Sequence, residues 1–213
     1  MEKKMIFSSI GVALSALLLI FAFLPCFSYK YVNPLADTID VNVSGFDAMR
    51  AYFTFGDSAQ KNAVATACFA DDPNSVLGAL LDGQSKYLYF VENDLTEDAA
   101  FKELAGFNSL VSALAIVEIM LLLFALLALV LGVLAVIGIK AILMHIINLG
   151  ATVIAGVIGL LSMAIGIFAG VSGQMGITAW SVIIGIIGAA TIATPFIAIK
   201  LKACVVREAL TAK

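Results

Sequence analysis

The last third of the chain sets the strongest constraint, because residues 141–199 contain no charged side chain and only one titratable one, the neutral His145. A single helix over this run would be roughly 90 Å long at about 1.5 Å per residue. The hydrocarbon core of a bilayer is only about 30 Å thick. The run must therefore fold back once, and the glycines and polar side chains of residues 171–176 suit the turn. This predicts two membrane-spanning helices, at about 142–170 and 177–199.

Two further apolar runs, residues 5–27 and 119–139, predict two more spans. Each supplies the roughly 20 residues that cross a bilayer. The first run also resembles a signal peptide, but residues 24–26 (Leu-Pro-Cys) offer no small-residue cleavage site, so we expect an uncleaved anchor. The helix of the second run is expected to begin earlier, with Asn108 or Ser109 as its N-cap.

The charged residues separate by sign along the chain. Twelve of the 15 acids fall between Asp37 and Glu103, in the long insert between the first two spans. The short flanks of the spans instead hold seven of the 12 basic residues: Lys3, Lys4, Lys140, Lys200, Lys202, Arg207 and Lys213. Because basic flanks stay in the cytoplasm, we expect a plasma-membrane protein with both termini cytoplasmic and the insert outside.

The predicted fold class is an all-α transmembrane four-helix bundle with a small mixed α/β extracellular domain inserted between helices 1 and 2. Residues 1–28 would form the cytoplasmic N-terminus and the first helix, and residues 29–108 the acidic extracytoplasmic domain. Residues 109–199 would form helices 2 to 4, and residues 200–213 a basic cytoplasmic tail.

The insert shows both strand and helix signals. Apolar and polar residues alternate over 39–43, which predicts a half-buried strand, and residues 86–91 (Lys-Tyr-Leu-Tyr-Phe-Val) predict a second one. Short helices are expected over about 58–69 and 74–81, and from Thr96 to Leu104.

Small side chains recur every four residues along the predicted spans. Lipid provides no hydrophobic drive for helix association, so close backbone contact must supply it. We expect these stripes to pack the bundle internally rather than to dock another protein or a second copy. The helix-packing candidates are Gly159, Gly166, Gly170, Gly185 and Ala189.

Two cysteines, Cys26 and Cys68, are expected on the outer side. They could form a disulfide in an oxidising compartment. Each could equally remain a small buried residue.

Glu118 is the only acid in a predicted span, and His145 is the only histidine of the protein. An ionisable group inside a membrane is a candidate functional residue. If Lys140 marks the inner surface, Glu118 lies near the outer edge and His145 near the inner edge. The two residues are then on opposite sides and cannot form one proton relay directly.

No sequence pattern indicates catalysis or a bound group. The chain lacks G-x-S-x-G, H-E-x-x-H, P-loop and C-x-x-C motifs, and the acidic stretch 92–98 lacks the central glycine of a calcium-binding EF-hand loop. We therefore expect a protein that is not an enzyme and has no cofactor and no metal. There is also no basic face for nucleic acid.

The topology resembles the claudin and PMP-22 group of tetraspan proteins, which have four spans, a large first outer loop that opens with a strand, and both termini inside. The resemblance covers the whole chain but matches no motif. That family carries a Trp, a Gly-Leu-Trp motif and two cysteines in this loop, whereas residues 29–108 contain no Trp and one cysteine, Cys68. The resemblance therefore implies a tetraspan layout and assigns no residue a role. The chain also resembles small bacterial membrane proteins, which adds no mechanism.

The composition and topology best fit a non-catalytic integral membrane interaction protein, scaffold or accessory subunit. Its extracytoplasmic domain would be presented to a membrane or envelope protein partner or to a second copy of the chain. The alternative is a channel or transporter component formed by oligomerisation, because the spans of one chain offer few polar residues to line a path.

Overall fold

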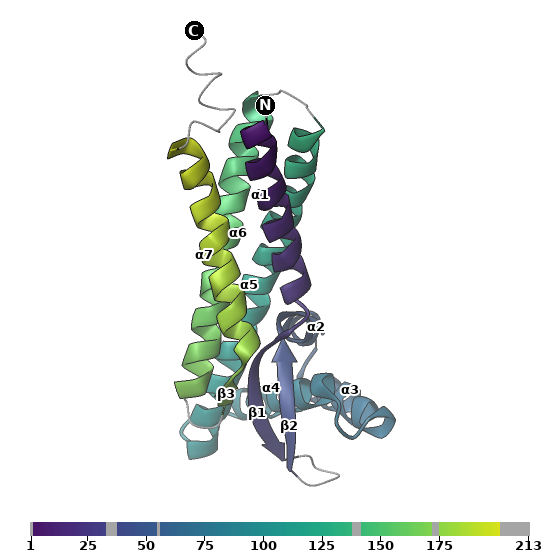
Figure 1. Ribbon diagram of the computed structural model, residues 1–213. Helices are drawn as coiled ribbons and strands as arrows, with labels where there is room; N and C mark the ends of the chain where they lie inside the picture. Colours follow the sequence, from purple (N-terminus) through teal and green to yellow (C-terminus); the bar gives the residue numbers. More distant parts are fainter. Residues whose placement is uncertain (1, 33–37, 55, 138–141, 172–174, 201–213) are drawn as a thin grey trace. The chain divides into compact units, whose positions relative to one another are not determined.

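The computed structural model describes residues 2–32, 38–54, 56–137, 142–171 and 175–200. The protein is mostly helical (80%) and carries a small three-stranded sheet (Figure 1). It divides into two compact units. Of the described residues, the helical unit comprises 2–22, 119–137, 142–163 and 182–200, and the polar unit comprises 23–32, 38–54, 56–118, 164–171 and 175–181.

Four helices contribute to the helical unit, and three of them also extend into the polar unit: α1 (Glu2–Phe21), α5 (Ala99–Val136), α6 (Ile142–Val171) and α7 (Ala179–Lys200). Three are long and apolar enough to cross a membrane, over Ala100–Val136, Leu143–Gly170 and Ala179–Lys200. The apolar part of α1, Ile6–Phe21, is shorter than the roughly 20 residues that a span needs. The structure thus shows three candidate spans, and the predicted fourth is not established.

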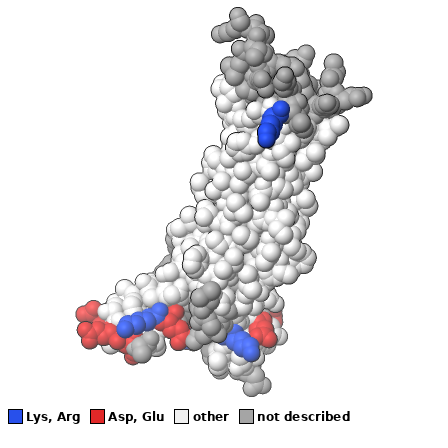
Figure 2. All heavy atoms as spheres, turned by 60° about the vertical axis from the view of Figure 1, so that its left-hand side comes forward, with Lys and Arg blue, Asp and Glu red and all other residues white. Residues whose placement is uncertain are grey.

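Large apolar side chains on these helices point outward. Leu123 is 58% exposed, Phe168 70% and Ile186 63%. In the face drawn in Figure 2, acidic side chains gather over the polar unit, whereas the surface of the apolar helices is largely white. Monomeric soluble proteins rarely expose large contiguous apolar patches. A multi-pass membrane protein, whose helices are solvated by lipid, is compatible with this surface.

Helices α6 and α7 pack backbone to backbone within the helical unit. A Cβ built on Gly156 would lie 2.7 Å from the carbonyl oxygen of Gly188, and one on Gly188 would lie 2.6 Å from that of Gly156. The predicted packing residue Gly159 lies at the same crossing, where its Cβ would be 3.3 Å from the Gly188 Cα. Gly185 packs against Met163.

Ala189, the remaining packing candidate in α7, is exposed. A spacing of four residues advances about 400° around a helix with 3.6 residues per turn, so each step drifts by about 40°. After Gly185, the next residue of α7 that contacts α6 is therefore Gly188, three residues on, and Ala189 faces away from α6. The prediction for Ala189 was wrong for this reason.

The polar unit contains a sheet in the order β2-β1-β3. Strand β1 (Pro25–Val32) pairs antiparallel with both β2 (Thr38–Ser44) and β3 (Met175–Ile177). Thr178, which follows β3, donates a hydrogen bond of 2.5 Å from its hydroxyl to the Pro25 carbonyl oxygen. The strand predicted at 39–43 is confirmed as β2. The break predicted at 171–176 falls where α6 ends at Val171; residues 172–174 lie outside the described residues, and Met175 and Gly176 begin β3.

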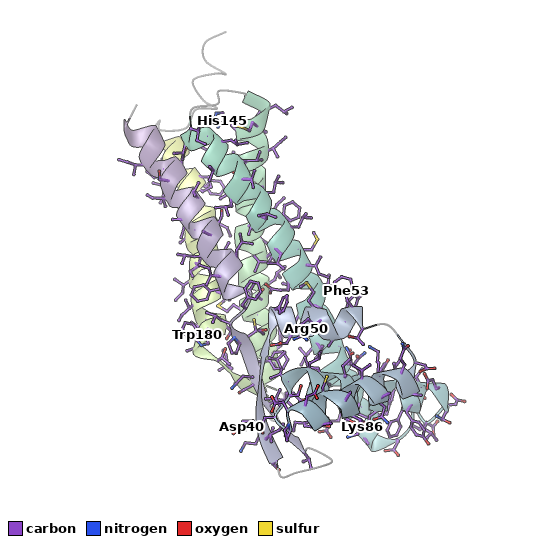
Figure 3. The ribbon with its side chains drawn as sticks, turned by 90° about the vertical axis from the view of Figure 1, so that its right-hand side faces the viewer. Asp40, Arg50, Phe53, Lys86, His145 and Trp180 are labelled. Carbon is purple, nitrogen blue, oxygen red and sulfur yellow. The ribbon has the colours of Figure 1, made fainter. Side chains whose placement is uncertain are left out.

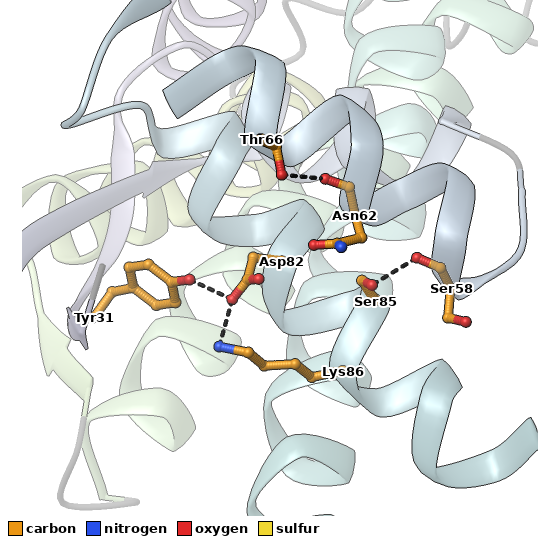
Figure 4. Close-up of polar contacts among 7 residues, drawn as sticks. All are labelled: Tyr31, Ser58, Asn62, Thr66, Asp82, Ser85 and Lys86. Atoms are coloured by element: carbon orange, nitrogen blue, oxygen red, sulfur yellow. Dashed lines mark hydrogen bonds and ion pairs between the residues drawn. The ribbon is translucent and has the colours of Figure 1, made fainter. Parts of the chain in front are cut away.

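Three capped helices complete the unit: α2 (Gly45–Phe53), α3 (Ser58–Asp71) and α4 (Val76–Glu92). Ser44 caps α2 in a reciprocal capping box with Asp47, and Asp57 and Ser75 cap the other two. The Ser85 hydroxyl donates to the Ser58 carbonyl oxygen at 2.7 Å, which ties α4 to the start of α3 (Figure 4).

Residues 86–91, predicted as a strand, are the last turns of α4. Tyr87 and Phe90 recur at helical spacing, and both rings contact Phe101, with centroids 5.5 and 6.4 Å apart. A helix presents these rings on one face, whereas a strand would have sent residues of odd and even number to opposite faces. Tertiary packing of aromatic rings therefore overrode the strand propensity.

The boundaries of two predicted spans also differ. Helix α5 has no N-cap at Asn108 or Ser109, because it begins at Ala99 and runs unbroken through Gly106. A glycine inside a helix costs only about 1 kcal/mol, which packing readily offsets. Helix α1 ends at Phe21, so Pro25 and Cys26 belong to β1 rather than to a span.

Gly166 and Gly170, predicted to pack helices, lie in the polar unit. A Cβ on Gly166 would lie 2.8 Å from the Ser181 Cβ, and one on Gly170 would lie 3.3 Å from the Ile177 backbone nitrogen. Both make close contacts, as expected for small residues. The predicted inner-surface marker Lys140 and the tail residues 201–213 lie outside the described residues.

Candidate functional site

The polar unit contains a buried carboxylate, that of Asp82 on α4, whose residue is 5% exposed. The Tyr31 hydroxyl on β1 donates a hydrogen bond to it, and the Lys86 ammonium lies 2.6 Å from the same oxygen (Figure 4). Lys86 also lies 5.7 Å from the centroid of the Tyr31 ring. A buried carboxylate needs both a counter-charge and hydrogen bonds, and this arrangement supplies them.

Both tyrosines of β1 are held in the protonated form. Burial, the hydrogen bond to Asp82 and the charge of that residue raise the pKa of Tyr31 well above its usual range. Burial and the Asp82 charge do the same for the pKa of Tyr29. The two phenols are therefore hydrogen-bond donors at neutral pH and are poorly suited to act as general bases.

A cavity of about 620 Å³ lies beside this network, between β1, α4 and the first turns of α5. Its charged lining residues are Lys30, Lys86, Lys102 and Glu103. Its apolar and aromatic lining includes Tyr29, Tyr31, Leu104, Phe107 and Leu110. We call this space the lysine cavity. Its volume is that of a typical ligand pocket, and its charge is net positive.

Two details shape the lysine cavity. A Cβ on Gly83 would lie 2.6 Å from the Phe107 ring, so only glycine allows that ring its position against α4. The Tyr29 hydroxyl is buried without a hydrogen-bond partner among the described residues. Lys30 and Lys102 are exposed, and within the described chain neither forms an ion pair. The cavity thus offers two cationic groups, Lys30 and Lys102, that no carboxylate among the described residues pairs with.

A second buried carboxylate belongs to Glu118 on α5. Its residue is 0% exposed, and neither carboxylate oxygen has a hydrogen-bond partner in the part of the chain that the structure describes. It lies directly against Gly45, the first residue of α2, where even a methyl group would collide with it. A helix N-terminus favours a negative charge, which gives the carboxylate partial compensation.

Cys26 lies close to this carboxylate and is 2% exposed. Burial, with a smaller contribution from the Glu118 charge, raises the pKa of the Cys26 thiol to about 12, although the Gly45 backbone amide acts in the opposite direction. Cys26 is therefore an inert thiol at neutral pH. The structure holds Cys26 and Cys68 as free thiols rather than as the bridged pair that the sequence allowed.

The other ionisable candidate, His145, lies in the first turn of α6 in the helical unit and is partly exposed (Figure 3). Glu118 belongs to the polar unit, so the two residues are parts of different units. Among the residues described, no three His, Cys, Asp or Glu side chains gather in a position to hold a metal ion.

Sequence reasoning missed the Tyr31–Asp82–Lys86 network and the lysine cavity. Tyr31 and Asp82 are 51 positions apart, and no local pattern pairs them. The i, i+4 spacing of Asp82 and Lys86 was a usable signal, but only once residues 86–91 are read as helix.

No protein-family model matches the chain, and no curated protein or solved structure matches it. The resemblance to the claudin and PMP-22 group therefore stays a prediction from topology.

Proposed function

We propose that this protein is a non-catalytic membrane interaction or accessory subunit. In this proposal four helices cross a cell membrane, both termini are cytoplasmic, and the polar unit is presented on the outer side. The helix α1 would be the fourth span, with its apolar part Ile6–Phe21 in the bilayer and Lys3 and Lys4 at the cytoplasmic surface. The separation of acidic insert and basic flanks supports this orientation.

The lysine cavity is the observation that carries the proposal. It combines Lys30 and Lys102, which form no ion pair with a carboxylate of the described residues, with aromatic and aliphatic walls. Such a surface is complementary to an acidic segment of a partner protein that also carries an apolar side chain. We therefore propose that an acidic segment of a membrane or envelope protein occupies it.

The polar groups beside the cavity support binding rather than catalysis. Asp82 is already engaged by a phenol and an ammonium, so it has no free role as a base. The raised pKa values of Tyr29 and Tyr31 keep both phenols neutral. These groups would orient a partner by hydrogen bonding, which requires no chemical step.

Site-specific photocrosslinking in native membranes tests the proposal. A photoreactive residue at Val32, which lines the cavity and is 69% exposed, should capture one partner protein. One at Ala67, exposed on α3, should not. Capture should be lost with Lys102→Glu, kept with Lys102→Arg, and kept with Arg50→Glu, a charge reversal on α2 outside the cavity. Equal capture in all variants, or none at Val32, would overturn the proposal.

The orientation has its own test. In a chain whose native cysteines Cys26, Cys68 and Cys204 are replaced by serine, a membrane-impermeant thiol reagent applied to intact cells should label a cysteine at Asp94 in the polar unit and should not label one at position 3. Labelling of both, or of position 3 alone, would refute an outer polar unit with a cytoplasmic N-terminus.

The buried carboxylate of Glu118 favours a second candidate, a channel or transporter component formed by oligomerisation. A buried carboxylate without a partner is expected to bind a proton or a cation. If transport depends on it, proteoliposomes should show ion flux that Glu118→Gln abolishes. Flux that is unchanged in this variant, or absent from the natural protein, would remove this candidate.

A further inference from the structure

Lys61 on α3 is a buried ammonium surrounded by neutral groups. Its residue is 8% exposed. Its Nζ donates hydrogen bonds to the Thr54 carbonyl oxygen at 2.6 Å and to the Gln84 side-chain oxygen at 3.0 Å. In the described part of the chain no carboxylate forms an ion pair with it. Burial accordingly lowers the pKa of Lys61.

One of its contacts has a structural explanation. Thr54 is the C-cap residue of α2, and a basic side chain at this end of a helix satisfies a free carbonyl group and favours the helix dipole. This role uses one of the three N–H donors of the ammonium, and Gln84 takes a second. These two contacts leave the third N–H donor of Lys61 and its positive charge without a partner among the residues that the structure describes. Burying a cation without a counter-ion costs folding free energy.

A cavity of about 310 Å³ lies directly at this ammonium. Lys61 and Gln84 line it, together with the polar side chains of Asn108 and Ser112 from α5. Tyr52, Tyr87 and Leu88 supply aromatic and aliphatic walls. At about 30 Å³ per small group, the space accommodates roughly ten non-hydrogen atoms.

We propose that this cavity binds a small organic carboxylate, with its carboxylate group on Lys61 and its apolar body against Tyr52, Tyr87 and Leu88. One ammonium neutralises one negative charge, so a monoanion completes the site, whereas a doubly charged phosphate would bring an unpaired charge into it. The amide of Asn108 and the hydroxyl of Ser112 can donate to the remaining lone pairs of the carboxylate. This site is separate from the lysine cavity, which is lined by different residues and is proposed to contact a protein.

Calorimetric titration of the full chain in detergent micelles tests the proposal, with benzoate as the probe. Its neutral isostere benzamide and inorganic phosphate are the comparison ligands. Benzoate should bind at least about tenfold more tightly than either, because only it provides a single negative charge on a flat apolar body. Equal binding of benzamide, preferred binding of phosphate, or no benzoate binding would overturn the proposal.

Variants assign the binding to this cavity. Lys61→Met should weaken benzoate binding at least about tenfold, whereas Lys102→Met, in the lysine cavity, should leave it unchanged. Ser112→Leu keeps the ammonium and fills the space, so it should also abolish binding, and it serves as the deciding variant if Lys61→Met does not fold. Benzoate affinity that Ser112→Leu leaves unchanged would refute the site. Partner capture is tested through Lys102, and benzoate binding through Lys61 and Ser112. Failure of the carboxylate-site proposal therefore leaves the proposed partner-binding function standing, and the reverse also holds.

Discussion

Cys26 is expected to resist alkylation in the folded protein by about three orders of magnitude. Burial and the neighbouring Glu118 charge raise the pKa of its thiol from 9.0 to about 12. The thiolate is the reactive species. At pH 8 its fraction therefore falls from about one in ten to about one in ten thousand. Because the side chain is only 2% exposed, restricted access slows the reaction further.

The measurement uses variants that keep one cysteine each. Cys26 remains in a variant with Cys68→Ser and Cys204→Ser, and Cys68 remains in its counterpart with Cys26→Ser and Cys204→Ser. Each is treated with iodoacetamide in native membranes and after unfolding in SDS, and modification is followed by mass spectrometry. Cys68, which is partly exposed, should lose much less of its unfolded rate on folding than Cys26.

The pH dependence gives the sharpest result. Since the thiol is protonated below its pKa, the alkylation rate of folded Cys26 should rise about tenfold per pH unit from pH 8 upward, with no plateau near pH 9. A plateau near pH 9, or a folded rate within about tenfold of the unfolded one at pH 8, would refute the burial of Cys26 against Glu118.

Two further predictions concern stability. Tyr31→Phe removes a hydrogen bond to the buried Asp82 carboxylate and should reduce the local free energy of unfolding by about 1.5–3 kcal/mol, measured by hydrogen exchange of β1 and α4 amides. Lys86→Met leaves the buried Asp82 carboxylate without its counter-charge and should cost at least about 1 kcal/mol, although solvent partly screens the half-exposed Lys86 side chain; an unchanged stability would contradict the pairing. Gly188→Val should cost at least about 1–3 kcal/mol in SDS titration of the purified protein, because its Cβ meets the α6 backbone, whereas Ala189→Val should change stability by less than about 0.5 kcal/mol. A larger loss of stability in Ala189→Val than in Gly188→Val would show that Ala189, not Gly188, faces α6.

The alternating strand at 39–43 and the helices of the spans were predictable because each depends on a local period. Apolar runs without charge can satisfy their backbone only as helices in lipid, so α6 and α7 follow closely from the positions of the uncharged residues. The sequence predicted that small residues pack the helices together, but it did not predict which of the small residues make the contact. A spacing of four drifts around the helix, and only the partner helix selects Gly188 over Ala189.

Residues 86–91 show where local information fails. Their tyrosines and valine favour a strand in isolation, but the contacts of Tyr87 and Phe90 with Phe101 stabilise a helix. The candidate sites were not predictable from the sequence for the same reason. Lys61 reads in the sequence as an ordinary surface lysine, and its burial beside the neutral Gln84 side chain appears only when α3 and α4 pack together.

The sequence by itself determined that much of this chain consists of apolar runs compatible with membrane spans and that a charged insert separates the first two, because hydropathy is a property of each residue and sums along the chain. Tertiary structure alone decided that β3 joins the sheet of β1, that Tyr31 meets Asp82, and that two cavities have lysines at their walls. These features depend on contacts between residues distant in the chain, and no local period encodes which distant partners will meet.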